Sequence, residues 1–373
     1  MSFSLACQTA LKDIKAKFDG NNIPKAFTYM LIDESQDFDE HFFALCELVT
    51  EKNIYIAGDI FQSIFDEEIS NTIEPDFLLG KCYRTDPKTL MFAHGLGMGL
   101  FEKSKLRWLE EKEWKDCGYQ VRIDENSKFH LQREPLRRFE DVEDYESIEI
   151  VGIKEKISSN VISILKRIRE EHPTVSPDDI GIILIDKSKQ IYSLADTLEL
   201  SIEFEFGWEV NKAYESKQKI PNQIFISNRN NVKGLEFPFV LCITRKLSDS
   251  PTYRNSLYTM LTRSFIKSYL VIPENDESGL TEGMKEGLQE IINKKEMIVT
   301  EPTDKEKELI RTRFESKVAK MSHYDLMISI FKKLKIDKKY HQKLLTATHQ
   351  LDMVEKDEET LIEWVRDNSK YLN

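Results

Sequence analysis

The stretch Leu31-Ile32-Asp33-Glu34-Ser35-Gln36-Asp37 decides the fold of this chain, because a nearly unbroken apolar run that begins at Phe27 ends there abruptly in acids. Such a run predicts a strand buried on both faces of a parallel sheet. Apolar residues at helical spacing follow between positions 42 and 49, and residues 53–57 read as the next strand, which closes with Gly58-Asp59. This strand, helix, strand alternation predicts an α/β domain that binds its ligands at the carboxyl ends of its strands.

A second α/β domain is expected further along the chain. Its predicted helix covers residues 160–171, and its predicted strands cover residues 147–151, 180–185, 224–226, 239–243 and 269–272. From Glu274 onward helical periodicity takes over, which predicts a separate module. We therefore expect four segments: a partial first domain at 1–101, a charged insertion or connector at 102–146, a second α/β domain at 147–275 and a helical C-terminal module at 276–373.

Composition narrows the class of protein. The chain has 373 residues, 40% of them hydrophobic and 32% charged, as in a globular protein of two or three domains. It contains no apolar run near the roughly 20 residues that span a bilayer and no recognisable signal peptide, so we expect no membrane partner. Five scattered cysteines fit neither a metal cluster nor a disulfide framework, which favours a reduced, cytoplasmic protein. The net charge of −12 argues against non-specific coating of nucleic acid but allows a narrow basic track.

The acids Asp33 and Glu34 form the first candidate site. Carboxylates at the end of a buried strand are costly unless positive charge lies beside them, and Mg²⁺ bound to phosphates supplies such charge. Asp33 would then hold the metal, and Glu34 would orient or deprotonate an attacking water. Alternatively, the two acids only favour the N-terminus of the following helix through its dipole. Taken alone, the pair does not separate these two interpretations.

Two arginines far apart in the sequence are the next candidates. Arg84 lies in a Tyr-Arg-Thr run at 83–85, and Arg263 ends a Leu-Thr-Arg run at 261–263. A guanidinium group is planar and always charged, which suits it to a fork of hydrogen bonds with phosphate oxygens. Two lobes that close over one nucleotide would bring such distant segments together, whereas a lone arginine more often belongs to a surface ion pair.

The order of these motifs resembles that of superfamily 1 DNA helicases of the UvrD/Rep/PcrA type, over about residues 26–272. The runs that carry the resemblance are Asp33-Glu34-Ser35-Gln36-Asp37, which is similar to a Walker B element, Gly58-Asp59-Ile60-Phe61-Gln62-Ser63-Ile64-Phe65, Cys82-Tyr83-Arg84-Thr85, Lys233-Gly234-Leu235-Glu236-Phe237 and Leu257-Tyr258-Thr259-Met260-Leu261-Thr262-Arg263-Ser264. The resemblance implies two RecA-like P-loop NTPase domains, the first truncated at its N-terminus, and a helical C-terminal module. It also implies ATP and Mg²⁺ as cofactors and single-stranded DNA as a partner.

The resemblance further implies a role for each candidate residue. The implied roles are metal binding for Asp33, activation of water for Glu34, sensing of the terminal phosphate for Gln62, contact with that phosphate for Arg84 and, from across the cleft, for Arg263, stacking on the base for Tyr83, and contact with the ribose for Glu236 in the motif that contains Gly234. Simpler interpretations stay open for two of them. Gln62 would be a turn amide, and Tyr83 would pack as an ordinary aromatic residue.

The sequence departs from this family in three respects. It contains no Gly-x-x-x-x-Gly-Lys-[Ser/Thr] loop, which cradles nucleotide phosphates, and only 32 residues precede Asp33. Asn228 and Asn230 stand where the family carries the threonine and histidine that touch the single strand, so any nucleic-acid contact there would use asparagine. The segment between Ile202 and Ile224 is too short for the family's accessory domain.

These departures leave three explanations open: a fragment of a longer helicase, one half of a split motor completed by a companion chain that supplies the Walker A half-domain, or a degenerate motor retained for binding. We expect an ATP-dependent DNA helicase or translocase core that hydrolyses ATP weakly or not at all by itself. The alternative is a catalytically inactive pseudo-helicase that binds DNA or protein in a repair or defence complex. The basic run at 331–340 would track a phosphate backbone, although such a run is more often the solvated face of an amphipathic helix.

Overall fold

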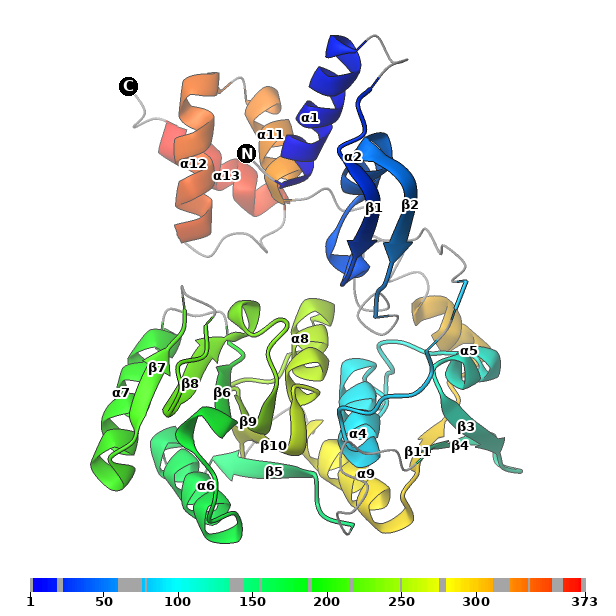
Figure 1. Ribbon diagram of the computed structural model, residues 1–373, viewed down its shortest axis with the longest axis vertical. Coiled ribbons are helices and arrows are strands. Elements are labelled where there is room, and N and C mark those ends of the chain that lie inside the picture. Colours follow the sequence, from blue (N-terminus) through cyan, green and yellow to red (C-terminus); the bar gives the residue numbers. More distant parts are fainter. Residues whose placement is uncertain are drawn as a thin grey trace. The chain divides into compact units, whose positions relative to one another are not determined.

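The structure is a computed structural model, and its contacts divide the chain into two compact units, residues 1–310 and residues 311–373 (Figure 1). The residues that it describes are 3–18, 23–59, 76–77, 79–134, 144–153, 156–186, 190–214, 218–248, 250–274, 280–310, 323–334, 336–350 and 358–369.

The first unit begins with a small α/β element in which strands β1 and β2 form a two-stranded parallel sheet. The register places Leu31 opposite Tyr55 and Met30 opposite Ile54. Stacked and tilted aromatic rings join helix α1 to helix α2 and the residues before it. The elements of this part are α1 (Phe3–Lys17), β1 (Phe27–Ile32), the single turn η1 (Ser35–Asp37), α2 (Glu40–Val49) and β2 (Thr50–Ile56).

Strand β1 is more exposed than its apolar sequence predicts. Phe27, Tyr29 and Leu31 lie on one face with 52%, 50% and 80% of their surface exposed, whereas Ile32 is buried. Burial on both faces requires other elements against both faces, and within the described ranges β1 pairs with β2 alone. The prediction that β1 is buried on both faces is therefore wrong for Phe27, Tyr29 and Leu31.

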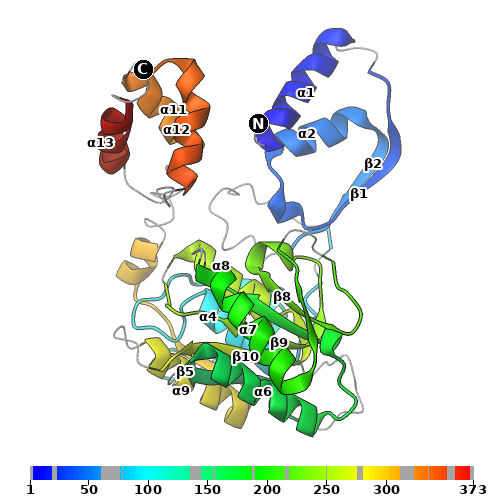
Figure 2. The same cartoon turned by 90° about the vertical axis from the view of Figure 1, so that its left-hand side faces the viewer.

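A six-stranded parallel sheet, in the order β5-β10-β9-β6-β8-β7, forms the centre of the first unit (Figures 1 and 2). Successive side chains belong to different cores: Ile182 packs with helices α6 and α7, and Ile183 packs with α4 and α8. Helices therefore cover both faces, which explains the continuous apolar runs of these strands and confirms the mixed α/β class. The elements are α4 (Pro87–Gly97), β5 (Ile148–Ile153), α6 (Ile157–Glu171), η2 (Pro177–Asp179), β6 (Ile180–Leu184), α7 (Gln190–Phe206), β7 (Glu209–Lys212), β8 (Gln223–Asn228), η3 (Arg229–Asn231), β9 (Phe237–Ile243), α8 (Pro251–Leu261) and β10 (Ser264–Pro273).

The segment 102–146, expected as a charged insertion or connector, contributes to a second, antiparallel sheet in the order β11-β4-β3. Trp114 on helix α5 is fully buried, and its ring centroid lies 5.0 Å from that of Tyr119. Composition hides this core because a few large apolar side chains are surrounded by many charged ones. The elements are α5 (Glu111–Asp116), β3 (Tyr119–Ile123), β4 (Lys128–Arg133), α9 (Leu280–Lys294) and β11 (Met297–Thr300).

The helical C-terminal unit begins later in the sequence than the boundary expected at residue 276. Helix α9 buries Met284, Leu288 and Ile291 in the same core as α4, and β11 pairs with β4. Because these elements complete the core and sheet of the first unit, they belong to it, and that unit ends at Ile310.

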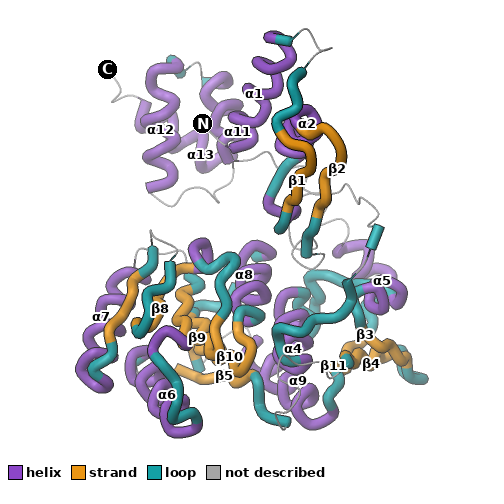
Figure 3. The backbone as a smooth tube through the Cα atoms, viewed as in Figure 1, coloured by secondary structure: helices purple, strands orange, loops and turns teal. Residues whose placement is uncertain are grey.

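The described residues of the second unit form three helices, α11 (His323–Lys333), α12 (Lys338–Gln350) and α13 (Glu358–Ser369) (Figure 3). Phe331 is fully buried in their common core, while Lys332 and Lys333 are exposed. The basic run is therefore, in its helical part, the solvated side of an amphipathic helix. None of the helices that the structure describes has the length and apolar character needed to cross a bilayer.

Candidate functional site

The turn after β1 holds the two candidate acids at the carboxyl end of the small sheet. The N–H of Ala57 donates to the carbonyl of Ile32, and the N–H of Ser35 donates to that of Ala57, at 2.8 and 2.9 Å. Glu34 adopts a left-handed conformation, with φ 52° and ψ 47°, and its N–H donates to Asp33 Oδ1 at 2.8 Å. A non-glycine residue in this region carries a backbone cost of about 1–2 kcal/mol, and such strain gathers at functional sites.

The turn after α8 places Arg263 in the interior of the first unit, with 3% of its surface exposed. Burial lowers the pKa of Arg263 and the positive charge of Arg84 lowers it further, while the carboxylates of Glu34 and Asp59 act in the opposite direction. These three charges come from three separate segments, and each is close enough to act on Arg263. The structure therefore brings Glu34, Arg84 and Arg263 into one neighbourhood.

Both arginines carry a buried hydrogen-bond donor without an acceptor among the described residues. Thr85 Oγ1 donates to the carbonyl of Thr262 at 3.0 Å, which fixes the neighbours of Arg84 and Arg263 against each other. The Nε–H groups of both arginines are buried and find no acceptor among the described residues. A buried donor left without an acceptor costs about 1–3 kcal/mol. Phosphate oxygens between the two guanidinium groups would meet that need.

Glu236 lies beside Arg84 in the structure. Arg84 Nη1 and Glu236 Oε1 are 3.3 Å apart, and both side chains are about one-third exposed. Gly234 has φ 81° in the preceding turn, with no atom within 4 Å of an added Cβ, so the backbone conformation rather than space favours glycine there. In the same turn, Lys233 Nζ lies 2.5 Å from Asp37 Oδ1 and links this motif to the turn after β1.

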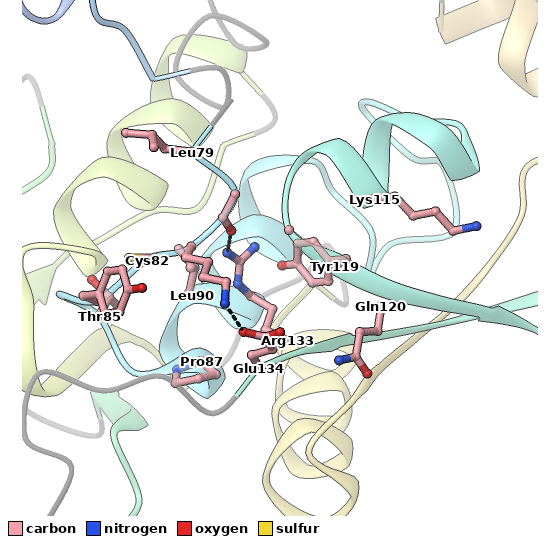
Figure 4. A pocket seen from close by; sticks show the side chains of 14 residues that line it. Leu79, Cys82, Thr85, Pro87, Leu90, Lys115, Tyr119, Gln120, Arg133 and Glu134 are labelled. Carbon is pink, nitrogen blue, oxygen red and sulfur yellow. Dashed lines mark hydrogen bonds and ion pairs between the residues drawn. The ribbon is translucent and has the colours of Figure 1, made fainter. Parts of the chain in front are cut away.

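Tyr83 borders a cavity of about 630 Å³ between the segment 79–85 and strands β3 and β4 (Figure 4). Its side chain is well exposed, as a platform for a flat ring requires. Arg133 donates to the carbonyl oxygens of Cys117 and Gly80 at 2.8 and 2.9 Å, and so holds the segment that leads to Tyr83. The sequence gives no sign of this support, because Arg133 lies in the stretch that reads as a connector.

The nucleic-acid candidates occupy the carboxyl end of β8. Asn228 Oδ1 accepts from the N–H of Asn230 at 3.0 Å and so caps the short η3 turn. The side chain of Asn230 is exposed, and Arg229 Nη1 donates to Ser256 Oγ at 2.8 Å. One of the two asparagines is thus engaged in a local cap.

Gln62 lies outside the described residues, so the structure locates its motif only as far as Asp59. The carboxylate of Asp59 accepts a hydrogen bond from the hydroxyl of Tyr258 at 3.1 Å. Asp59 and Tyr258 both stand inside motifs that carry the family resemblance, but the resemblance implies no role for either residue.

The residues present fit a magnesium ion bound through substrate phosphates. Within the described ranges, no three His, Cys, Asp or Glu side chains gather as a preformed metal site. Mg²⁺ commonly keeps several waters and is held by one or two carboxylates together with phosphates. Asp33 is exposed at the strand end and Glu34 is half-buried beside it, an arrangement that suits this mode of binding.

A parallel sheet with helices on both faces is consistent with the C-terminal domain of a helicase. Residues 223–271, which run from β8 into β10, match the family described as the UvrD-like helicase C-terminal domain. This portion of the chain is therefore similar to the C-terminal portion of UvrD-type helicases, as the motifs from Lys233 to Arg263 indicate.

Other comparisons add little detail. One solved structure that resembles the chain is the C-terminal domain of a possible DNA helicase from Lactobacillus plantarum WCFS1. It is 15% identical, with a TM-score of 0.33, and the match covers 56% of this chain and 97% of that chain. No curated protein matches the chain.

Proposed function

We propose that this chain is part of an ATP-dependent DNA helicase or translocase of superfamily 1, and that it binds magnesium-ATP between the Asp33-Glu34 turn and the Arg84–Arg263 pair. One observation carries the proposal: two arginines from distant segments lie together with buried Nε–H donors that find no acceptor among the described residues. Two RecA-like domains and a helical C-terminal module are the architecture that goes with this function.

Each candidate side chain has a task in this proposal. Magnesium, when bound, neutralises phosphate charge. Asp33 holds that ion, and Glu34 orients the attacking water and accepts its proton. Arg84 and Arg263 stabilise the charge that develops on the terminal phosphate. Gln62 senses the same phosphate, Tyr83 stacks on the base, and Glu236 accepts a hydrogen bond from the ribose, with Gly234 shaping its turn.

A companion chain that supplies the phosphate-binding loop is part of the proposal. The sequence contains no Gly-x-x-x-x-Gly-Lys-[Ser/Thr] run. The apolar face of β1, with Phe27, Tyr29 and Leu31, is exposed in the structure. A companion half-domain that pairs a parallel strand with the edge of β1 and packs apolar side chains against this face would bring its phosphate-binding loop to Asp33 and Glu34. The other partner is single-stranded DNA, at the turn of Asn228 and Asn230.

A catalytically inactive pseudo-helicase is the second candidate, and one observation favours it. Arg84 and Glu236 already form an ion pair with each other. In a protein that never binds nucleotide, this pair would simply be structural. Such a chain would serve as a DNA- or protein-binding subunit.

Nucleotide binding distinguishes the two candidates. We expect the chain to bind ATP more tightly with magnesium than without it, and expect Asp33→Asn to abolish most of the difference because it removes the carboxylate charge that holds the ion. Glu51→Gln, at an exposed position on β2, serves as the matched control and should leave the difference unchanged. Titration calorimetry measures both. An ATP affinity that changes neither with magnesium nor with Asp33→Asn contradicts the motor and supports the pseudo-helicase.

A further inference from the structure

Helix α8 carries a buried tyrosine, Tyr258, whose side chain reaches the small α/β element. Its hydroxyl donates to Asp59 Oδ2 at 3.1 Å. Asp59 belongs to the turn that leads into the segment containing Gln62. Tyr258 stands in the last turn of α8, which ends at Leu261, and Arg263 lies two residues after that end. One hydrogen bond thus connects two segments that each carry a candidate phosphate-contacting residue.

The ring of Tyr258 is held by buried groups on its other side. It stacks on the imidazole of His94, with ring centroids 5.2 Å apart and an interplanar angle of 29°. His94 Nδ1 in turn lies 2.5 Å from the hydroxyl of Tyr119. All three side chains are at least 95% buried. Because close-packed surroundings fix the ring, the hydroxyl is a stationary donor to which the carboxylate of Asp59 aligns.

The carboxylate of Asp59 changes the pKa of both Tyr258 and Arg263. Burial raises the pKa of Tyr258 well above its ordinary value and Asp59 raises it further, so the phenol remains a donor at physiological pH. Asp59 also counteracts part of the lowering of the pKa of Arg263. Movement of the Asp59 turn would therefore change the environment of Arg263.

We infer that Tyr258 is a positioning residue that sets the Gly58-Asp59 turn against Arg263 before the nucleotide arrives, an inference that rests on the proposed function. The hydroxyl itself touches no phosphate. Its removal leaves the buried ring and Arg263 in place but frees the turn. The loss should therefore fall on recognition of the terminal phosphate and leave recognition of the base and ribose intact.

The ratio of magnesium-ATP to magnesium-ADP affinity measures this effect in the full chain. Tyr258→Phe should reduce the preference for ATP by about 10-fold, the value of a typical buried hydrogen bond near 1.4 kcal/mol, and leave ADP affinity unchanged. Asp59→Ala should do the same, and the double variant should be no worse. Asp59→Asn keeps an acceptor oxygen and should restore the preference.

Tyr253→Phe is the matched control, because Tyr253 is also buried on α8 but its hydroxyl bonds to Thr244 and to the carbonyl of Lys246. It should leave the ATP preference unchanged. A Tyr258→Phe protein that is folded and keeps the wild-type preference overturns the inference, as do additive effects of Tyr258→Phe and Asp59→Ala.

Hydrogen exchange tests the link without nucleotide. The N–H of Ala57 and that of Ser35 hold the ends of β1 and β2 together beside Asp59. Tyr258→Phe should speed their exchange several-fold, and Tyr253→Phe should not. A wild-type chain that binds neither nucleotide would contradict the proposed function. The hydrogen-exchange comparison would then test the positioning role of Tyr258 by itself. Equal exchange in Tyr258→Phe and wild type would overturn the positioning role.

Discussion

Replacing Gly118 with alanine should damage the support of the Tyr83-Arg84 segment. Gly118 has φ 82°, and an added Cβ would lie 1.8 Å from the carbonyl oxygen of Gly80. The left-handed backbone costs an alanine about 1–2 kcal/mol. Relieving the overlap by moving residue 80 adds about 1–3 kcal/mol. We therefore expect a loss of about 2–5 kcal/mol in the free energy of unfolding of the first unit, together with weaker nucleotide binding.

Urea unfolding followed by fluorescence measures this loss, since Trp114 is buried four positions before Gly118. Gly207→Ala is the matched control. Gly207 has φ 65° but no atom within 4 Å of an added Cβ, so only the backbone cost of about 1–2 kcal/mol applies. The reasoning is refuted when Gly118→Ala costs no more than Gly207→Ala, or when it destabilises the unit without any effect on nucleotide affinity.

Three further predictions concern other parts of the first unit. Burial and the positive charge of Arg133 hold the pKa of His94 well below its ordinary value. As pH falls below about 6.5, the histidine therefore takes up a proton in the unfolded chain but not in the folded protein. The free energy of unfolding then falls by about 1.4 kcal/mol per pH unit. In His94→Gln this slope, measured by urea unfolding between pH 5 and 7.5, should be smaller, and an unchanged slope would show that His94 is not responsible. Leu31→Ser should change the free energy of unfolding by less than about 0.5 kcal/mol, since the side chain is 80% exposed. It should nevertheless weaken association with the companion chain, measured by sedimentation. Phe204→Ser, at a residue 90% exposed on α7, should change neither the stability nor this association. Trp114→Ala should cost about 3–5 kcal/mol by thermal or urea unfolding; a cost below 1 kcal/mol would mean that α5 is not part of the core.

The apolar runs predict the large sheet well, and the reason is physical. Strands such as 180–184 and 239–243 are buried on both faces, so their side chains are apolar at every position and need no alternation. Strand β1 has the same kind of sequence but exposes Leu31. Sequence alone cannot distinguish the two cases, because it records which surfaces are apolar and not what covers them.

The candidate site could be predicted in part. The candidate residues for phosphate contact stand in short ordered motifs, and in the structure Glu34 and Arg84 both act on the pKa of Arg263. The roles of these residues stay predictions. Supporting residues carry no such signal. Arg133 reaches Gly80 through a hairpin whose charged sequence reads as a connector, and His94 lies in a glycine-rich helix without any motif. Their roles depend on tertiary contacts alone.

A double-substitution cycle on magnesium-ATP affinity tests the central claim most directly. Arg84→Ala and Arg263→Ala should each weaken binding by about 10- to 150-fold, the value of a hydrogen bond to a charged group of about 1.5–3 kcal/mol. The double variant should lose less than the product of the two, because both guanidinium groups act on one phosphate. Strictly multiplicative losses, or wild-type affinity in either single variant, would contradict a shared nucleotide site.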